Sequence, residues 1–206
     1  MQRRIEKIIE ILNRKYKVKL WKENPFKVLV TTVISQRTKD EVTRKASKKL
    51  FSVASTPEKI LKLSEKRIAE LIYPSGFYKE KAKRIKQICK ILLKKYKGKV
   101  PATREELLKL PGVGWKTADV ILCYGFGKEV IPVDVHVSVV SRRLNLTKSK
   151  NLEKIREDLH EAIPRKYRRI VNHLFVEFGK EICQTRLPLC YKCPIVKLCP
   201  YEDKNI

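Results

Sequence analysis

The sequence predicts an all-α fold, and three observations support this prediction. Apolar residues recur every three or four positions along much of the chain, which is the spacing of one face of a helix. Residues that favour helix starts and helix ends stand at the boundaries of these stretches. Only two segments, 28–34 and 130–140, are rich enough in β-branched residues to suggest strands. Because two strands alone would have little sheet to join, and a buried helix can be apolar on all sides, we expect both to be mainly helical.

The expected helices follow in chain order. Apolar residues at positions 5, 8, 9, 12 and 16 indicate an N-terminal helix, and further stripes indicate helices around 60–61, 68–71 and 82–96. The boundary signals are capping residues before first-turn prolines, a capping box and a glycine stop, at Asn24-Pro25, Thr56-Pro57, Thr103 with Glu106, and Gly98. Most of the chain is therefore expected to be helical.

The chain carries a large excess of positive charge, with 48 Lys and Arg residues against 22 Asp and Glu residues and a formal net charge of +26. Such a charge needs an acidic partner: nucleic acid, an anionic membrane surface or an acidic protein. The simpler alternative is the Lys-rich surface of a heat-adapted protein, but Glu rises with Lys in such proteins and does not keep pace here. The chain has no apolar run of about 18 residues, so we expect no membrane span. The first residues lack the apolar region of a signal peptide. We therefore expect a cytoplasmic protein that binds nucleic acid.

Four cysteines near the C-terminus are spaced C-x6-C-x2-C-x5-C, at Cys183, Cys190, Cys193 and Cys199. Four thiolates so close in sequence are typical of a metal centre, and disulfides are not expected in a cytoplasmic chain. The spacing leaves a tetrahedral zinc site and a cubane iron–sulfur cluster as alternatives. The other two cysteines, at 89 and 123, lie in apolar helical stripes and are expected to be core residues.

A second motif, LPGVGWKTA at residues 110–118, lies between a helix ending near 110 and another running to about 124. Glycines at positions 112 and 114 allow a short turn whose backbone N–H groups face outward and bind a phosphate. The motif therefore predicts a helix-hairpin-helix that contacts the DNA backbone through Gly112, Val113 and Gly114 without reading sequence. By itself it indicates binding rather than catalysis.

Two polar residues are the candidates for catalysis. Lys116 falls in the first turn of the second hairpin helix, where the positive end of the helix dipole disfavours a cation and favours a neutral, nucleophilic amine. Its alternative role is a surface lysine that contacts phosphate. Asp134 stands before the next helix, where it could accept the proton of Lys116, stabilise positive charge on a sugar, or simply cap that helix. His136 is expected to be a structural residue with its hydrogen bonds satisfied.

Taken together, the sequence LPGVGWKTADVIL, the segment VDVH at 133–136 and the four-cysteine spacing resemble the endonuclease III branch of the helix-hairpin-helix DNA glycosylases. The resemblance extends from about Asn24 through the segments 34–40 and 75–78 to Cys199. It covers nearly the whole chain, and the joint motif set is highly specific.

The resemblance implies two helical domains: a helical barrel at 22–128, and a domain formed by 1–21 and 129–206 that ends in a [4Fe–4S] cluster loop. Double-stranded DNA would lie across the cleft between them. It also implies that the four cysteines hold this cluster rather than zinc, and that the protein is a nucleoid-associated monomer.

The implied activity is that of a bifunctional DNA glycosylase and AP lyase, which excises oxidised pyrimidines in base excision repair. Lys116 would attack C1′ of the damaged nucleotide with help from Asp134, and β-elimination would follow on the 3′ side of the abasic site. Relatives that are purely hydrolytic glycosylases lack the lysine. Two alternatives stay open: a glycosylase for thymine or uracil mismatched with guanine, and a non-catalytic DNA-binding iron–sulfur protein.

Three positions depart from the family pattern. Trp115 stands where relatives commonly have Arg. The glutamine with which relatives fill the duplex gap aligns best with Arg37, while Gln36 lies one step earlier, so either residue is a candidate for that role. Phe77 aligns with an apolar wedge residue, and its alternative role is core packing.

Overall fold

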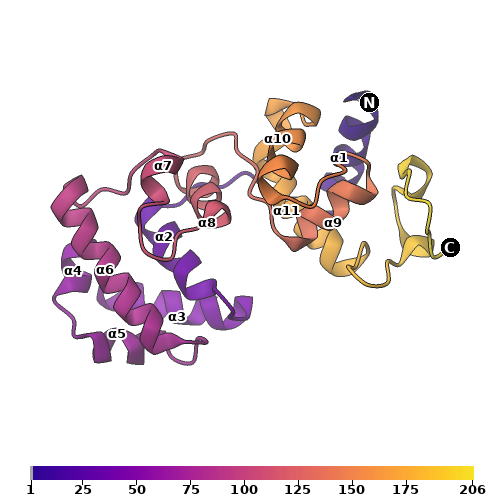
Figure 1. Cartoon of the computed structure of the whole chain (residues 1–206). Coiled ribbons are helices and arrows are strands. Elements are labelled where there is room, and N and C mark those ends of the chain that lie inside the picture. Colours follow the sequence, from indigo (N-terminus) through magenta and orange to yellow (C-terminus); the bar gives the residue numbers. More distant parts are fainter. Residues whose placement is uncertain (1) are drawn as a thin grey trace. The chain divides into compact units, whose positions relative to one another are not determined.

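The computed structural model describes residues 2–206, which contain helices and no strand, so the predicted all-α class is confirmed (Figure 1). The chain forms two compact units. The first, which we call the hairpin unit, is Lys22–Gly127. The second, which we call the cysteine unit, contains the described residues up to Trp21 together with Lys128–Ile206.

The hairpin unit is built around one central helix, α2 (Pro25–Ser35), which packs against four other elements of this unit. Its β-branched and apolar residues are buried on nearly every side, which confirms that 28–34 is helical and explains why its sequence resembles a strand. The surrounding elements are α3 (Asp40–Val53), α4 (Pro57–Leu61), α5 (Glu65–Ile72), α6 (Tyr78–Tyr96), α7 (Arg104–Leu107) and α8 (Trp115–Val120), which continues as a π-helical turn, η1 (Ile121–Gly125).

The predicted helix boundaries of this unit are confirmed by their hydrogen bonds. Asn24 Oδ1 accepts from the backbone N–H groups of residues 26 and 27, and Thr56 Oγ1 accepts from that of residue 59. The Thr103 hydroxyl accepts from the Glu106 N–H and donates to the Glu106 carboxylate. Gly98, with φ of 77°, follows the end of α6 as expected.

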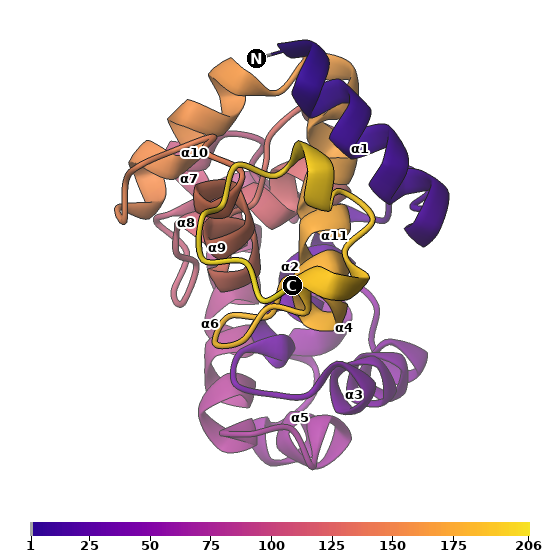
Figure 2. The same cartoon turned by 90° about the vertical axis from the view of Figure 1, so that its right-hand side faces the viewer.

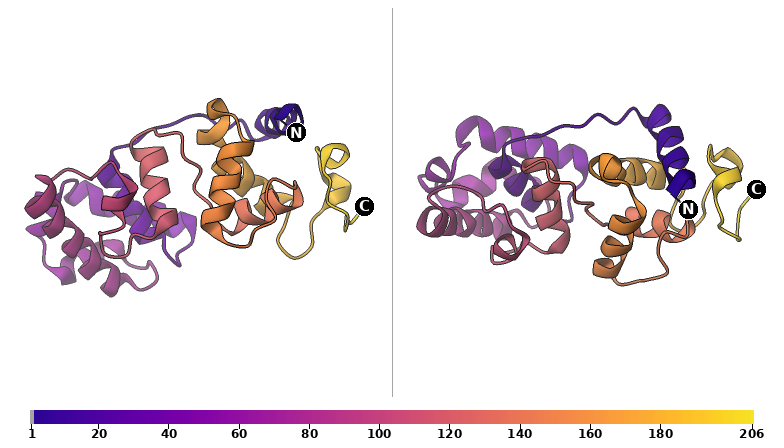
Figure 3. Two further views of the ribbon diagram at one scale, coloured as in Figure 1. Left: turned by 45° about the horizontal axis from the view of Figure 1, so that its top comes forward. Right: turned by 90° about the horizontal axis from the view of Figure 1, so that it is seen from above.

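The cysteine unit contains α1 (Gln2–Tyr16), α9 (Val135–Arg143), α10 (Leu152–Ala162) and α11 (Arg165–Glu181). Helix α11 packs against both α1 and α9, and α9 also packs against α10 (Figure 2). The apolar stripe of α1 at 5, 8, 9 and 12 is fully buried, together with Phe175 and Phe178 of α11. After α11 the chain forms a loop with two 3-10 turns, η2 (Cys190–Lys192) and η3 (Val196–Leu198) (Figure 3).

The prediction for 130–140 is only partly correct, because helix α9 begins at Val135 and residues 130–134 are not helical. Pro132 has no N–H to donate and restricts the residue before it, which disfavours a helix across this point. The segment is held by other contacts: the Pro132 carbonyl accepts from Asn172 Nδ2 at 2.8 Å. The β-branched residues of 130–134 therefore belong to a non-helical connection that is buried at 131–133.

Within residues 2–206, no helix combines the length and the apolar character needed to cross a membrane.

Candidate active site and cysteine cavity

The two glycines of the hairpin turn between α7 and α8 differ in the space available for a side chain. Gly112 has φ of 76°, and a Cβ atom at this position would lie 2.3 Å from Cδ of Arg84. A side chain is therefore excluded there by both backbone conformation and space. Gly114 is the N-cap of α8, and a Cβ atom there would meet nothing within 4 Å. The start of α8 thus faces open space, whereas Val113 is only 6% exposed and its N–H donates to the Leu110 carbonyl at 3.1 Å.

Lys116 is the second residue of α8 and is exposed, directly after the open turn at Gly114. The first turn of α8 contains no acidic residue. Its amine therefore stands in the positive field of the helix start, as the sequence predicts.

A buried ion pair that sequence reasoning missed joins the two helices of the hairpin. Arg104 of α7 donates through Nε to Oδ1 of Asp119 in α8 at 2.8 Å, and Asp119 is only 2% exposed. The Arg104 guanidinium also lies over the ring of Trp115, 5.7 Å from its centroid. Trp115 thereby packs against a positive charge from the neighbouring helix while one side stays exposed. A signal was available, since an acidic residue within the apolar sequence ADVIL requires a partner.

Gln36 and Arg37 occupy different environments. The Gln36 carboxamide uses both of its ends inside the hairpin unit: Nε2 donates to the Gly112 carbonyl, and Oε1 accepts from Arg84, each at 2.9 Å. It therefore links the chain after α2 to the hairpin turn. Arg37 is exposed and has φ of 51°.

Phe77, the candidate wedge residue, lies next to Arg37. It is 58% exposed, so the alternative that it packs in the core is wrong. The Arg37 guanidinium stands 5.6 Å from the centroid of the Phe77 ring. Phe77 also has a left-handed backbone, with φ of 55°. The structure thus brings together two exposed residues from the ends of α2 and α6.

Asp134 lies in the cysteine unit and caps α9. One carboxylate oxygen, Oδ1, accepts from the Val137 N–H at 2.9 Å. The capping role predicted from its position is confirmed.

The expectation that His136 has its hydrogen bonds satisfied is wrong, because among the described residues nothing bonds its buried Nδ1. The ring packs against the backbone of α11, and a Cβ atom at Gly179 would lie 3.0 Å from Nδ1. Close packing between α9 and α11 thus encloses the imidazole edge.

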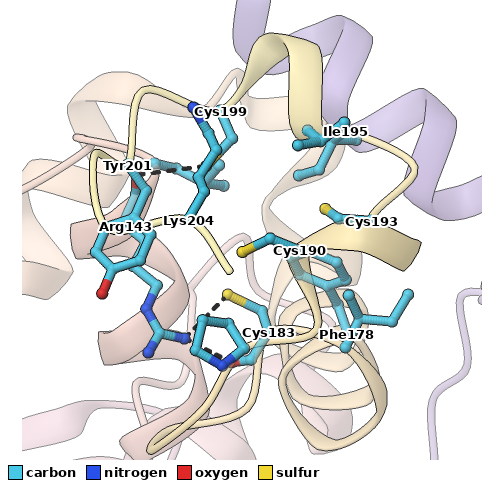
Figure 4. A pocket seen from close by; sticks show the side chains of 13 residues that line it. Arg143, Phe178, Cys183, Cys190, Cys193, Ile195, Cys199, Tyr201 and Lys204 are labelled. Atoms are coloured by element: carbon cyan, nitrogen blue, oxygen red, sulfur yellow. Dashed lines mark hydrogen bonds between the residues drawn. The ribbon is translucent and has the colours of Figure 1, made fainter. Parts of the chain in front are cut away.

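The four C-terminal cysteines line one cavity in the cysteine unit (Figure 4). Figure 4 shows the sulfur atoms of Cys183, Cys190 and Cys193 on the cavity side. None of the cysteines forms a disulfide. Among residues 2–206, the side chains as placed form no group of three or more His, Cys, Asp or Glu that could hold a metal ion.

The walls of this cavity are mainly apolar, with residues such as Phe178, Ile182 and Ile195. Burial raises the pKa of the Cys193 thiol to about 11, because a thiolate is poorly solvated there. Arg143 supplies the nearby positive charge, and its Nη1 donates to Cys183 Sγ at 3.4 Å and to the Gln184 carbonyl at 2.7 Å. Arg143 was not found from the sequence, since only the fold brings α9 to the C-terminal loop.

The comparisons with known proteins agree with these features. Residues 30–165 match the family described as HhH-GPD superfamily base excision DNA repair protein. Endonuclease III of Thermotoga maritima is 45% identical over 182 residues, which cover 88% of this chain and 85% of that protein. A solved trapped endonuclease III–DNA covalent intermediate is 32% identical, with a TM-score of 0.86 over 98% of this chain and 96% of that chain. A thermostable thymine-DNA glycosylase is 27% identical, with a TM-score of 0.86 over 97% of this chain and 96% of that chain. The chain therefore belongs to the endonuclease III family of the HhH-GPD superfamily, the bifunctional DNA glycosylases and AP lyases of base excision repair.

Proposed function

We propose that this chain excises oxidised pyrimidines from double-stranded DNA with Lys116 as the nucleophile. The observation that carries the proposal is an exposed lysine in the first turn of α8, directly after the open turn at Gly114. The amine attacks C1′ of the damaged nucleotide, the glycosidic bond breaks, and the base leaves with the bonding electron pair and a proton. The nitrogen loses one proton, the bond between C1′ and the ring oxygen breaks as that oxygen takes up a proton, and the nitrogen, which keeps its other hydrogen, is joined to C1′ of the opened sugar as an iminium.

The same link accounts for strand cleavage. The iminium acidifies the C2′ hydrogen, a base removes that proton, and the electrons expel the 3′ phosphate in a β-elimination. Water then hydrolyses the imine and releases Lys116. One amine thus serves both the glycosylase and the lyase step.

Asp134 is proposed to assist Lys116 electrostatically and as a proton acceptor. Its capping bond to Val137 fixes the carboxylate at the start of α9. A carboxylate held in this way stabilises positive charge on the sugar or takes the proton that the attacking amine must lose. The two roles, cap and catalyst, are compatible because a carboxylate has two oxygen atoms.

The remaining site residues are proposed to hold the DNA. Backbone N–H groups at Gly112, at Gly114 and at the start of α8 bind phosphate, while the Val113 N–H holds the turn through the Leu110 carbonyl, and the net charge of +26 supplies the general attraction. Arg37 and Phe77 enter the duplex where the damaged nucleotide leaves the stack, because they are exposed and adjacent. Gln36 supports the hairpin turn instead of entering the duplex, since both ends of its carboxamide are engaged.

The four cysteines are proposed to hold a [4Fe–4S] cluster. The donor set fits this group: four thiols line one mainly apolar cavity, and an Arg143 N–H points at the Cys183 sulfur. Cys183, Cys190, Cys193 and Cys199 would be the ligands. A bound cluster would cross-link a C-terminal loop whose only regular structure, within the described residues, is two 3-10 turns. In this proposal the cysteine unit is the cluster domain and the hairpin unit is the DNA-binding barrel.

Iron content and colour test the cluster. The purified protein is expected to be yellow-brown, to absorb broadly in the blue part of the visible spectrum, and to contain iron. Colourless protein with one bound zinc would contradict the proposal.

A second candidate substrate is thymine or uracil mismatched with guanine. The likeness to a thymine-DNA glycosylase supports it, as does Arg37 at the position where relatives have glutamine. An assay of the purified protein on three duplexes, with thymine glycol, with uracil opposite guanine and with a bare abasic site, separates the candidates. Cleavage of the first and third with little action on the second is expected; preference for the mismatch would favour the second candidate. The protein is further proposed to act as a monomer at the nucleoid, in the cytoplasm, where DNA is its substrate.

A further inference from the structure

Two short loops carry the exposed pair Arg37 and Phe77. One loop follows α2, and the other precedes α6. Both residues have positive φ, 51° and 55°, in the left-handed region that non-glycine residues rarely occupy. Such conformations persist only where the surrounding structure holds them. The hairpin unit must therefore contain contacts that fix both loops.

Lys81, in the second turn of α6, provides such contacts. Although it is a lysine, it is only 3% exposed. Its ammonium group donates to the Ile34 carbonyl at the end of α2, at 2.6 Å, and to the Thr38 hydroxyl in the following loop, at 2.8 Å. It thus holds the first loop from both sides of Arg37.

The Thr38 hydroxyl extends this connection to the second loop. Its oxygen accepts from the Gly76 N–H at 3.1 Å as well as from Lys81, and its hydrogen is donated to the Gln36 carbonyl at 3.3 Å. One donor and two acceptor sites are all that a hydroxyl has, so Thr38 is fully used. Lys81, Thr38 and Gly76 therefore form a continuous hydrogen-bonded link between the two loops.

The two loops also touch directly. A Cβ atom at Gly76 would lie 2.8 Å from the Arg37 carbonyl oxygen, so only glycine allows this approach. Beside this contact lies a cavity lined by Gln36, Arg37, Phe77, Glu80, Lys81 and Arg84. Lys81 thus lines the same cavity as the two exposed side chains.

We propose that Lys81 is a positioning residue for lesion recognition, which ties the Arg37 loop to the Phe77 loop so that both side chains enter the duplex at one place. The inference rests on the proposed function of Arg37 and Phe77. A buried ammonium group is costly, and burial together with the charge of Arg84 lowers the pKa of Lys81 to about 8. An apolar side chain would fill this position without that cost, so the two directed hydrogen bonds are what the lysine contributes.

The test compares Lys81→Met with a matched control on the same helix. Lys86 also donates from α6 to a backbone carbonyl, that of Leu63, at 2.7 Å. This carbonyl belongs to neither of the two loops that carry Arg37 and Phe77. For Lys81→Met we expect Kd and KM for a lesion duplex to rise about tenfold, the effect of losing roughly one buried charge-assisted hydrogen bond. The Kd for undamaged duplex and the kcat at saturating substrate should change less than threefold, which is a smaller effect than the loss of one such hydrogen bond. Lys86→Met should leave both KM and kcat near those of the unchanged protein.

Thr38 supplies a second pair of variants, which decides the question if Lys81→Met does not fold. Thr38→Val removes the hydroxyl and keeps the shape, whereas Thr38→Ser keeps the hydroxyl. We expect the valine variant to show the same rise in KM and the serine variant to restore the original value. Equal behaviour of the two would overturn the inference.

A variant cycle distinguishes positioning from general stability. If Lys81 acts through Arg37 and Phe77, then adding Lys81→Met to the double variant Arg37→Ala and Phe77→Ala should not weaken binding to a lesion duplex further. Additive losses, or a Lys81→Met effect no larger than that of Lys86→Met, would contradict the proposed role. If the unchanged protein neither prefers lesion DNA nor forms a covalent intermediate, the proposed function itself fails. If it does both and Lys81→Met still recognises lesions normally, only the positioning role is wrong.

Discussion

At the scale of single residues, Asp134 combines a structural contact with a proposed catalytic charge. Asn keeps the oxygen that caps α9 but removes the charge, so Asp134→Asn should fold normally and lower turnover by about 100-fold, the order of a lost general base. Asp134→Ala should additionally lose about 1 kcal/mol of stability with the cap. Urea unfolding and single-turnover kinetics measure the two effects separately.

The control for this prediction is Asn151, which caps α10 in the same unit by accepting from the N–H groups of residues 153 and 154. Asn151→Ala should cost about 1 kcal/mol of stability and leave turnover unchanged. If Asp134→Asn loses stability but has no separate kinetic defect, Asp134 is a cap only.

Lys81 gives a pH prediction. Its pKa is about 8 in the folded chain, below the ordinary value, so between pH 8 and 10.5 the unfolded chain binds more protons. The free energy of unfolding should therefore rise with pH across this window, by about 3 kcal/mol relative to Lys81→Met. Urea unfolding of both proteins at pH 7 and pH 10 measures this difference. If this difference in the free energy of unfolding stays constant or falls as the pH rises, the hydrogen bonds to Ile34 and Thr38 offset the cost of burying the ammonium group, and the pKa of Lys81 is not lowered.

Burial of Lys81 could have been suspected from the sequence. It lies four residues before Ile85 and eight before Cys89, on the apolar stripe of its helix. Its partners could not have been found, because the Ile34 carbonyl and the Thr38 hydroxyl reach it only through the packing of α2 against α6. The same limit applied to Gln36 and Arg37: both align near the gap-filling position, and only the contact of Gln36 with Gly112 distinguishes them.

At the scale of elements, the hairpin turn offers a matched pair of glycines. Gly112→Ala requires a strained backbone and displaces Arg84, which breaks the link from Arg84 through Gln36 to the turn. We expect this variant to lose about 1–3 kcal/mol of stability and much of its DNA affinity. Gly114 has φ of −95°, and a methyl group there would meet nothing within 4 Å. Gly114→Ala should therefore change the free energy of unfolding by less than about 0.5 kcal/mol.

Unfolding by urea and titration with undamaged duplex measure both glycine variants. Equal stability of the two would mean that the turn tolerates a side chain at Gly112, contrary to the packing described above.

Helix α2 and the segment 130–134 show what a composition signal can and cannot predict. They belong to the two segments, 28–34 and 130–140, that are rich in β-branched residues and that are predicted from the sequence to be mainly helical. In α2 the expectation holds because four neighbouring elements bury it on nearly every side. In 130–140 it holds from Val135 onward and fails before it, where Pro132 disfavours a helix.

At the scale of the whole molecule, the charge of +26 predicts strongly salt-dependent binding. If about five phosphates are neutralised, the logarithm of the affinity should fall with the logarithm of salt concentration at a slope near −4 or −5. Fluorescence anisotropy with an undamaged duplex at several salt concentrations measures this slope. A slope near zero would mean that the basic surface serves another partner.

The family and the all-α class could be predicted from the sequence because several local motifs occur in one order with specific spacing. Each motif alone was ambiguous: the spacing of Cys183 to Cys199 allowed zinc or a cluster, and Lys116 alone allowed a phosphate contact. The Arg104–Asp119 pair and the Arg143 contact with Cys183 were not predicted, because each joins residues from elements that only the fold brings together.

Borohydride trapping tests the central claim most directly, because it records the covalent link between Lys116 and the sugar. The unchanged protein, and Lys109→Gln as a control at an exposed lysine just before the hairpin turn, should form a trapped complex with lesion duplex and with abasic duplex. Lys116→Gln should form none and cleave neither, while retaining most of its affinity, since the backbone of the hairpin turn still binds phosphate. A trapped complex and strand cleavage by Lys116→Gln would show that another amine attacks C1′, and that the mechanism proposed for this chain is wrong.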